Sequence, residues 1–110
     1  SAARLEKIKP RLLRAGLKQV VCQAIEGITD SRLAKLTGKA DRVLVDAPCT
    51  GLGTLRRNPA LKWQYQPEDI ESFVQQQRDI LEKASSLVRP GGVLVYATCS
   101  ILQEENQQVA

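Results

Sequence analysis

The sequence of 110 residues has room for one domain at most, and its apolar content of 43% is that of a globular chain rather than a disordered one. It has no apolar run long enough for a membrane span, no histidine and three cysteines, which disfavours a membrane protein, a histidine-based triad, a metal site and a disulfide framework. Residues 1–63 carry 13 Lys and Arg against 5 Asp and Glu, whereas residues 64–110 carry 3 against 7. The basic part suits a phosphate-rich partner or an ordinary solvated helix face, and the odd cysteine count favours a reducing, cytoplasmic location.

The first part of the chain predicts short elements. Residues 4–15 show apolar side chains at helical spacing, and Pro10 within them predicts a kink or a late helix start. Residues 18–24 predict a short strand in which Cys22 faces the core. Residues 31–36 predict one or two helical turns.

A buried strand is predicted over residues 42–46, because a short β-branched run stops there at an acid followed by Pro48. A loop of about 20 residues then follows, and loops of that length in compact domains are usually functional or disordered. It interleaves basic and aromatic side chains: Arg56, Arg57, Lys62 and Trp63. These residues suit phosphate pairing and base stacking, although Trp63 alone is equally consistent with a side chain that pins the loop to the body.

A long helix is predicted to begin at Pro67 and to end at the sequence RPGG of residues 89–92. Its apolar stripe consists of Ile70, Phe73, Val74, Ile80, Leu81, Ala84, Leu87 and Val88. A second strand follows the Gly-Gly turn and ends near Cys99, and residues 102–110 predict an acidic helix start. Strand, helix and strand form a βαβ unit, so Cys49 and Cys99 should emerge at the same edge of a parallel sheet.

Two cysteines at neighbouring strand ends, with Asp46 beside one of them, allow three interpretations. A redox pair is disfavoured because the spacing is not that of a CxxC motif. Structural burial is the commonest role of a single cysteine. The third is covalent catalysis at an electrophilic ring carbon, in which one cysteine attacks and the other assists proton removal.

The motifs resemble those of a known family. They are DAPCTGLG at residues 46–53, RNP at 57–59 with KW at 62–63, PGG at 90–92, YATCS at 96–100, and EEN at 104–106. Together they resemble the Sun/Fmu family of RNA cytosine-5 methyltransferases, closest to the bacterial branch that methylates small-subunit ribosomal RNA (16S rRNA methyltransferase B type). The resemblance covers nearly the whole chain, and two cysteine motifs at this separation are specific.

The resemblance implies a role for each matching residue and an α/β fold of the Rossmann-like, S-adenosylmethionine-dependent type. Cys99 matches the nucleophile that adds to cytosine C6, and Cys49 matches the cysteine that assists removal of the C5 proton and release of the RNA. Asp46 matches an acid between the cofactor and the target base, and Pro48 shapes that loop beside the cofactor. The implied cofactor is S-adenosylmethionine, and the implied partner is RNA, in particular ribosomal RNA.

The sequence departs from the family pattern before Cys49, where no GxG loop occurs. We therefore expect residues 1–110 to be the C-terminal part of a methyltransferase catalytic domain, without the first strands and the Gly-rich cofactor loop, and to be inactive alone. The family's usual acid near the adenine falls at Ile25, next to Glu26. The alternatives are a non-catalytic RNA-binding module and an amino-group methyltransferase, neither of which needs a second cysteine at a second strand end.

Overall fold

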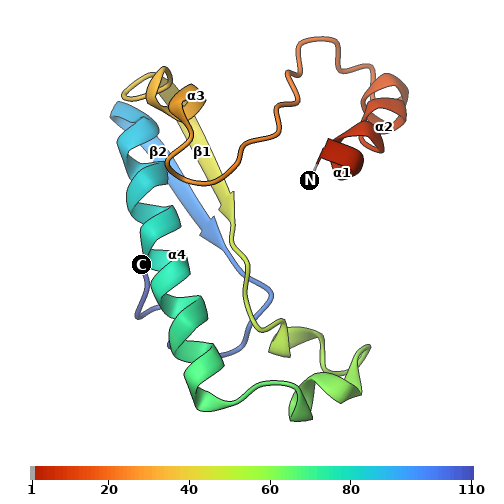
Figure 1. Cartoon of the computed structure of the whole chain (residues 1–110). Helices are drawn as coiled ribbons and strands as arrows, with labels where there is room; N and C mark the ends of the chain where they lie inside the picture. Colours follow the sequence, from red (N-terminus) through yellow and green to blue (C-terminus); the bar gives the residue numbers. More distant parts are fainter. Residues whose placement is uncertain (1) are drawn as a thin grey trace. The chain divides into compact units, whose positions relative to one another are not determined.

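The computed structural model describes residues 2–110 and divides the chain into two compact units, Ser1–Asp30 and Ser31–Ala110 (Figure 1). The first unit contains α1 (Ala2–Glu6) and α2 (Lys9–Arg14). The second contains α3 (Ser31–Ala34), β1 (Ala40–Asp46), the 3₁₀ turns η1 (Leu52–Thr54) and η2 (Pro59–Trp63), α4 (Pro67–Leu87) and β2 (Val88–Ala97). None of the helices within residues 2–110 is long and apolar enough to cross a membrane.

The first unit confirms the predicted helix break and contradicts the predicted strand. Pro10 lies in the first turn of α2, where its missing N–H costs no intrahelical hydrogen bond, so the helix starts anew there. Residues 18–24 form no strand, and Cys22 is only half-buried. A β-branched run becomes a strand only with a hydrogen-bonding partner, and none of the described residues pairs with this segment.

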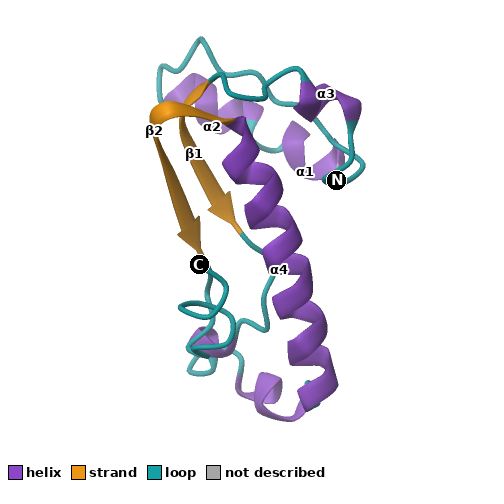
Figure 2. Ribbon diagram, turned by 90° about the vertical axis from the view of Figure 1, so that its left-hand side faces the viewer, coloured by secondary structure: helices purple, strands orange, loops and turns teal. Residues whose placement is uncertain are grey.

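The second unit is the predicted βαβ arrangement. Figure 2 shows β1 and β2 side by side and pointing the same way, with α4 between them in the sequence. They pair in parallel from Arg42 opposite Val93 to Asp46 opposite Ala97, with a register shift before Arg42. The predicted turn at residues 89–92 is instead an irregular start of β2, which follows α4 directly. Gly92 fits there because a Cβ would lie 2.8 Å from the carbonyl oxygen of Asp41.

The core lies between α4 and one face of the two strands. Val45 and Ala47 of the first strand and its exit pack against Ala84 of α4, and four half-buried side chains surround them: Val43, Ile80, Leu94 and Tyr96. Alternate strand residues point to opposite faces, so Leu44, Val93 and Val95 lie on the uncovered face and are exposed. The sheet is therefore anchored on one face only within this unit.

The last residues form turns rather than the predicted helix start. The Asn106 side chain donates hydrogen bonds to the carbonyl oxygens of Leu102 (2.7 Å) and Ser100 (3.1 Å), and it accepts one from the Thr98 hydroxyl (2.8 Å). In a helix the carbonyl of Leu102 would accept from the backbone N–H of Asn106 instead. The amide side chain thus competes with helix formation and folds the segment back beside β2.

Candidate active site

Cys49 and Cys99 lie in contact beyond the carboxyl ends of the two strands. Their Sγ atoms are 3.3 Å apart, within hydrogen-bond distance for two thiols. Cys49 is half-buried, Cys99 is exposed, and neither forms a disulfide. The prediction that the two thiols emerge together at one edge of the sheet is confirmed by this distance.

The two loops that carry the thiols are joined through their backbones. Directly after β1, Ala47 N–H donates to the carbonyl oxygen of Ala97, the last residue of β2 (3.0 Å), and further along Gly53 N–H donates to Cys99 O (2.9 Å). A Cβ at position 53 would lie 2.7 Å from that same carbonyl oxygen, so only glycine permits this approach. Gly51 has a φ of 72°, in the left-handed region that glycine adopts without strain.

A buried carboxylate joins the residues that follow the two cysteines. Glu105 is 0% exposed and Thr50 is 1% exposed. Oε1 of Glu105 accepts from the Thr50 backbone N–H (2.9 Å), and Oε2 accepts from the Thr50 hydroxyl (2.6 Å) and from the Ser100 hydroxyl. One carboxylate thereby binds the residue after Cys49 and the residue after Cys99.

Helix α4 adds a third element to this cluster through Gln77, which is also fully buried. Its Nε2 donates to Glu105 Oε1 (3.0 Å) and to the carbonyl oxygen of Pro48 (2.9 Å). The Tyr96 hydroxyl donates to the carbonyl oxygen of Glu105 (2.9 Å). The helix, both loops and the C-terminal segment therefore meet at Glu105.

Burial, hydrogen bonds and nearby charge shift the pKa values of three groups in the site. Burial alone would raise the pKa of Glu105, but the hydrogen bonds from Ser100, Thr50 and Gln77 outweigh it and hold the pKa below the usual range, which keeps the carboxylate ionised. Burial and the hydrogen bond with Cys99 raise the pKa of Cys49. Burial and the nearby Glu105 charge raise the pKa of Tyr96, so its hydroxyl stays a donor.

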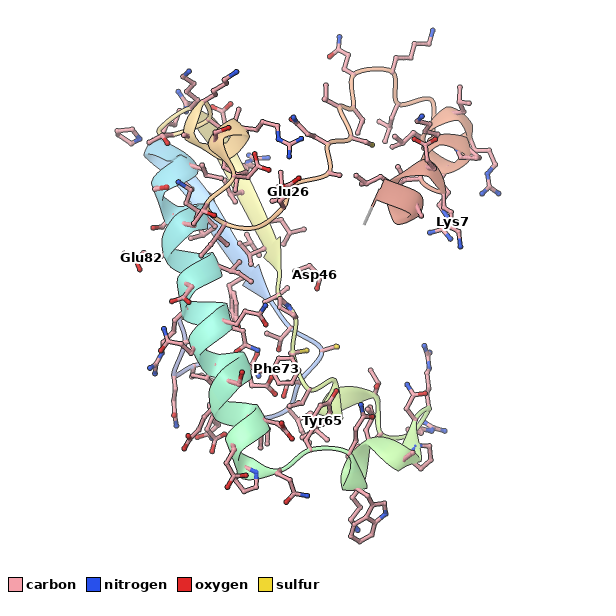
Figure 3. The ribbon with its side chains drawn as sticks, in the orientation of Figure 1. Lys7, Glu26, Asp46, Tyr65, Phe73 and Glu82 are labelled. Carbon is pink, nitrogen blue, oxygen red and sulfur yellow. The ribbon has the colours of Figure 1, made fainter. Side chains whose placement is uncertain are left out.

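Asp46 and Pro48 lie between the strand and the thiols. Asp46 is the last residue of β1, is exposed and points away from α4 (Figure 3). Its carboxylate forms no hydrogen bond or ion pair with any residue that the structure describes, so it is available to a ligand. Pro48 is exposed, and its carbonyl is held by Gln77.

The predicted RNA-binding side chains lie on η2 and on the link between η1 and η2. Arg56, Arg57 and Lys62 are exposed, and Trp63 is 79% exposed with the Lys62 Nζ 5.0 Å from its ring centroid. The exposure of Trp63 contradicts the interpretation that its ring pins the loop to the body. Tyr65 makes that contact instead, with its ring edge-on to Phe73 of α4 at 5.6 Å between centroids (Figure 3).

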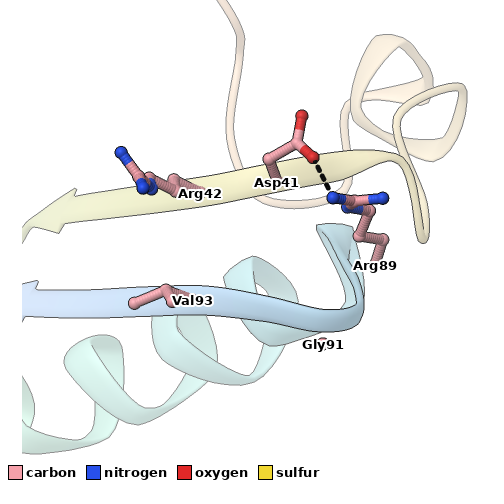
Figure 4. A pocket seen from close by; sticks show the side chains of 5 residues that line it. All are labelled: Asp41, Arg42, Arg89, Gly91 and Val93. Atoms are coloured by element: carbon pink, nitrogen blue, oxygen red, sulfur yellow. Dashed lines mark ion pairs between the residues drawn. The ribbon is translucent and has the colours of Figure 1, made fainter.

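A separate hollow lies at the opposite ends of the strands. It is lined by Asp41, Arg42, Arg89, Gly91 and Val93, and the Arg89 guanidinium pairs with the Asp41 carboxylate at 2.6 Å (Figure 4). This hollow holds no thiol, and sites of open α/β sheets lie beyond the carboxyl ends of the strands. The cysteine edge is therefore the candidate active site.

The sequence prediction missed the buried cluster of Thr50, Gln77 and Glu105. One signal was present in the helical stripe, since Gln77 occupies the apolar position between Phe73 and Ile80. A polar residue on a core-facing stripe requires a buried partner. Nothing in the spacing indicated that this partner is Glu105, 28 residues further along the chain.

Comparison with known proteins gives one consistent family. The sequence matches the 16S rRNA methyltransferase RsmB/F family over residues 1–110. It is 47% identical over 105 residues to the putative methyltransferase Rv1407 of Mycobacterium tuberculosis (strain ATCC 25618 / H37Rv), covering 90% of this chain and 22% of that protein. It is 43% identical over 105 residues to ribosomal RNA small subunit methyltransferase B of Enterobacter sp. (strain 638), covering 96% and 24%.

Two solved structures share the fold. The crystal structure of PH0851 superposes with a TM-score of 0.88 at 38% identity, over 99% of this chain and 24% of that one. NSun6 from Pyrococcus horikoshii, solved with SFG, superposes with a TM-score of 0.80 at 37% identity, over 98% and 27%. The chain thus spans about a quarter of the length of the proteins it matches. The resemblance carried by the two cysteine motifs is confirmed, and the chain belongs to the RsmB/F family of 16S rRNA methyltransferases.

Proposed function

We propose that residues 1–110 form part of the catalytic domain of an enzyme that methylates C5 of cytosine in ribosomal RNA, with Cys99 and Cys49 as its catalytic pair. The observation that carries the proposal is the 3.3 Å contact of the two thiols beyond the carboxyl ends of β1 and β2. Membership of a 16S rRNA methyltransferase family supports it, as does the Enterobacter relative, named a ribosomal RNA small subunit methyltransferase.

The nucleophile is Cys99. Cytosine C5 is a poor nucleophile until a thiolate has added at C6, and the exposed Cys99 is the more accessible of the two thiols. Its thiolate forms a bond to C6, and the electron pair of the C5–C6 double bond becomes available at C5. The target base must leave its stack to enter such a site.

Cys49 assists the second half of the reaction. Because burial and the hydrogen bond with Cys99 raise its pKa, Cys49 keeps its proton while Cys99 attacks. After the attack Cys49 gives this proton to solvent, and because its pKa is raised the resulting thiolate is a stronger base than an ordinary cysteine thiolate. It takes the proton from C5, the C5–C6 double bond re-forms, and the bond from C6 to Cys99 breaks to release the RNA.

The cofactor of this family is S-adenosylmethionine, which when bound supplies the methyl group that C5 accepts. The chain's residues fit a ligand at this place, because the Asp46 carboxylate is exposed without a described partner where the strand ends. We assign Asp46 to the space between cofactor and target base, where it can accept from the N4 amino group of cytosine. Pro48 shapes the wall beside it.

The RNA is held by the exposed basic and aromatic side chains of the η1–η2 region. Arg56, Arg57 and Lys62 suit phosphate contacts, and the Trp63 ring suits stacking on a base. All three cysteines are free thiols, which suits an enzyme that works in the reducing cytoplasm.

The test uses the protein that carries this sequence, with Cys49→Ala, unmethylated ribosomal RNA and S-adenosylmethionine. If Cys99 attacks and Cys49 assists release, this variant stays attached to RNA through a denaturing gel. The double variant Cys49→Ala/Cys99→Ala should show no such band. Cys22→Ala is the matched control, since this half-buried thiol lies in the first unit, and it should neither trap RNA nor lose activity.

Other outcomes identify the alternatives. Methylation that survives Cys99→Ala, with the methyl group on an exocyclic nitrogen, would indicate an amino-group methyltransferase. Salt-sensitive RNA binding without methylation, unaffected by loss of both thiols, would indicate an RNA-binding module. Absence of an adduct with C5 methylation intact in both single variants would show that the thiols are structural.

A further inference from the structure

The strongest feature outside the proposed catalytic residues is the buried polar cluster beneath the thiols. Among the side chains whose burial the structure describes, three polar ones are buried, and all three belong to this cluster: Thr50, Gln77 and Glu105. Glu105 is the charged member. Removing a carboxylate from water costs free energy unless hydrogen bonds compensate the loss of solvation. The hydrogen bonds of a fully buried carboxylate therefore indicate its structural role.

The hydrogen bonds of Glu105 link two segments that are far apart in the sequence. Thr50 directly follows Cys49, and Ser100 directly follows Cys99. Both hydroxyls donate to Glu105 Oε2, and the two hydroxyl oxygens are only 3.3 Å apart. The carboxylate therefore lies where the two cysteine loops meet.

Both carboxylate oxygens of Glu105 accept hydrogen bonds from donor groups. Oε1 accepts from the Thr50 backbone N–H and from Gln77 Nε2, and neither nitrogen can act as an acceptor. Oε2 accepts from two hydroxyls, which are able to turn. A glutamine at position 105 would keep one acceptor oxygen and place an amide nitrogen against the hydroxyls, so it would retain half of the arrangement without the charge.

We propose that Glu105 is a positioning residue whose buried carboxylate ties the loop after β1 to the loop after β2 and so holds Cys49 and Cys99 in contact. Glu105 touches neither thiol in the structure; it acts through Thr50 and Ser100. The proposal rests on the function proposed above for its effect on catalysis, whereas its effect on the distance between the thiols is independent of any RNA chemistry.

The independent readout is the binding of phenylarsine oxide, a trivalent arsenical that bridges two thiols in close contact. The protein with the native sequence should bind one equivalent through Cys49 and Cys99, and Cys49→Ala should abolish this binding. In Glu105→Gln the affinity should fall about tenfold, the scale of one hydrogen bond to a charged group, and in Glu105→Ala it should fall further. Glu104→Gln, the exposed neighbour, is the matched control and should bind as the native protein does.

The catalytic readout separates positioning from substrate binding. Glu105→Gln should lower kcat for methylation by a similar factor with KM for RNA unchanged, because it alters the thiol pair and not the exposed basic loop. A circular dichroism spectrum checks that the variant is folded. If Glu105→Gln fails to fold, Ser100→Ala replaces it, since this change removes one donor and leaves the carboxylate in place; it should weaken arsenical binding and kcat severalfold.

Unchanged arsenical binding in the folded Glu105→Gln variant, or in Ser100→Ala where that replaces it, would overturn the proposal. So would a rise in KM for RNA without a fall in kcat. Failure of the proposed function looks different: the native protein would then methylate no cytosine C5, while arsenical binding would still depend on Glu105.

Discussion

At the scale of single residues, the site depends on two glycines at which the backbone has no room for a side chain or turns with a positive φ. Gly53 brings its backbone against the Cys99 carbonyl, where any Cβ would lie 2.7 Å from the oxygen. Gly51 turns the chain directly after Thr50 with a positive φ. These two glycines allow the Cys49 loop to fold over the end of β2, and this places one thiol half-buried and the other exposed. The two thiols therefore differ in burial although they are in contact.

The raised pKa of Cys49 predicts its alkylation behaviour. Its reaction with iodoacetamide should have a pH midpoint above the value of about 8.5 for a free thiol, because only the thiolate reacts and burial disfavours that form. Cys99→Ala should lower the midpoint without restoring the free value, since it removes the hydrogen bond but leaves part of the burial. The midpoint is measured by mass spectrometry of the alkylated Cys49 peptide at a series of pH values, with the alkylation of glutathione as the reference for a free thiol. A midpoint at or below that of glutathione would contradict the assignment of Cys49 as the protonated partner.

At the scale of elements, α4 connects the core to the site. Its core-facing stripe packs Ile80 and Ala84 against the sheet. Closer to the N-terminus of the helix, Gln77 on the same stripe donates hydrogen bonds to Glu105 and to the carbonyl oxygen of Pro48. A shift of the helix along its axis would therefore disturb both the packing and the polar cluster. The start of the helix is fixed by a capping box, in which Asp69 accepts from the Gln66 backbone N–H at 2.8 Å and the Gln66 side chain receives a reciprocal bond.

Removal of this cap should destabilise the fold without touching the thiols. Asp69→Ala should lower the free energy of unfolding by about 1 kcal/mol for the lost cap, in addition to the loss of one negative charge at the helix start. Glu68→Ala is the matched control, because it removes a negative charge from the same helical turn but no capping bond, and it should cost only about 0.3–1 kcal/mol through the helix dipole. Urea denaturation of both variants measures the difference. Equal losses would mean that the charge, not the capping box, stabilises the helix start.

At the scale of the whole molecule, local patterns and long-range contacts were not equally predictable. The βαβ unit and the meeting of Cys49 and Cys99 followed from the sequence, because parallel strands place their carboxyl ends at one edge whatever the side chains do. The strand predicted at residues 18–24 was wrong because its existence depends on a partner that a local pattern does not reveal. The Glu105 cluster was missed for the same reason, since Thr50 and Glu105 lie 55 residues apart.

We expect the uneven charge of the molecule to act on RNA binding at the exposed η1–η2 region. If Arg56 and Arg57 contact phosphates, the double variant Arg56→Ala/Arg57→Ala should weaken RNA binding. It should also reduce the slope of the logarithm of the RNA-binding constant against the logarithm of the salt concentration. The reduction should be about 0.7 for each lost phosphate contact to single-stranded RNA. Trp63→Ala should weaken binding by about 1–3 kcal/mol through lost stacking and leave the slope unchanged. Fluorescence anisotropy with ribosomal RNA fragments at several salt concentrations separates the two effects.

The matched control is Arg89→Ala, which also removes one positive charge but lies at the opposite ends of the strands, paired with Asp41. If charge acts only through the net field of the molecule, each single arginine variant and Arg89→Ala should change the slope alike. If the η1–η2 region binds the RNA backbone directly, Arg89→Ala should leave the slope unchanged while Arg56→Ala and Arg57→Ala each reduce it. Identical slopes for all three variants would therefore remove this region from the RNA-binding surface, because a phosphate contact releases counterions only where it is made.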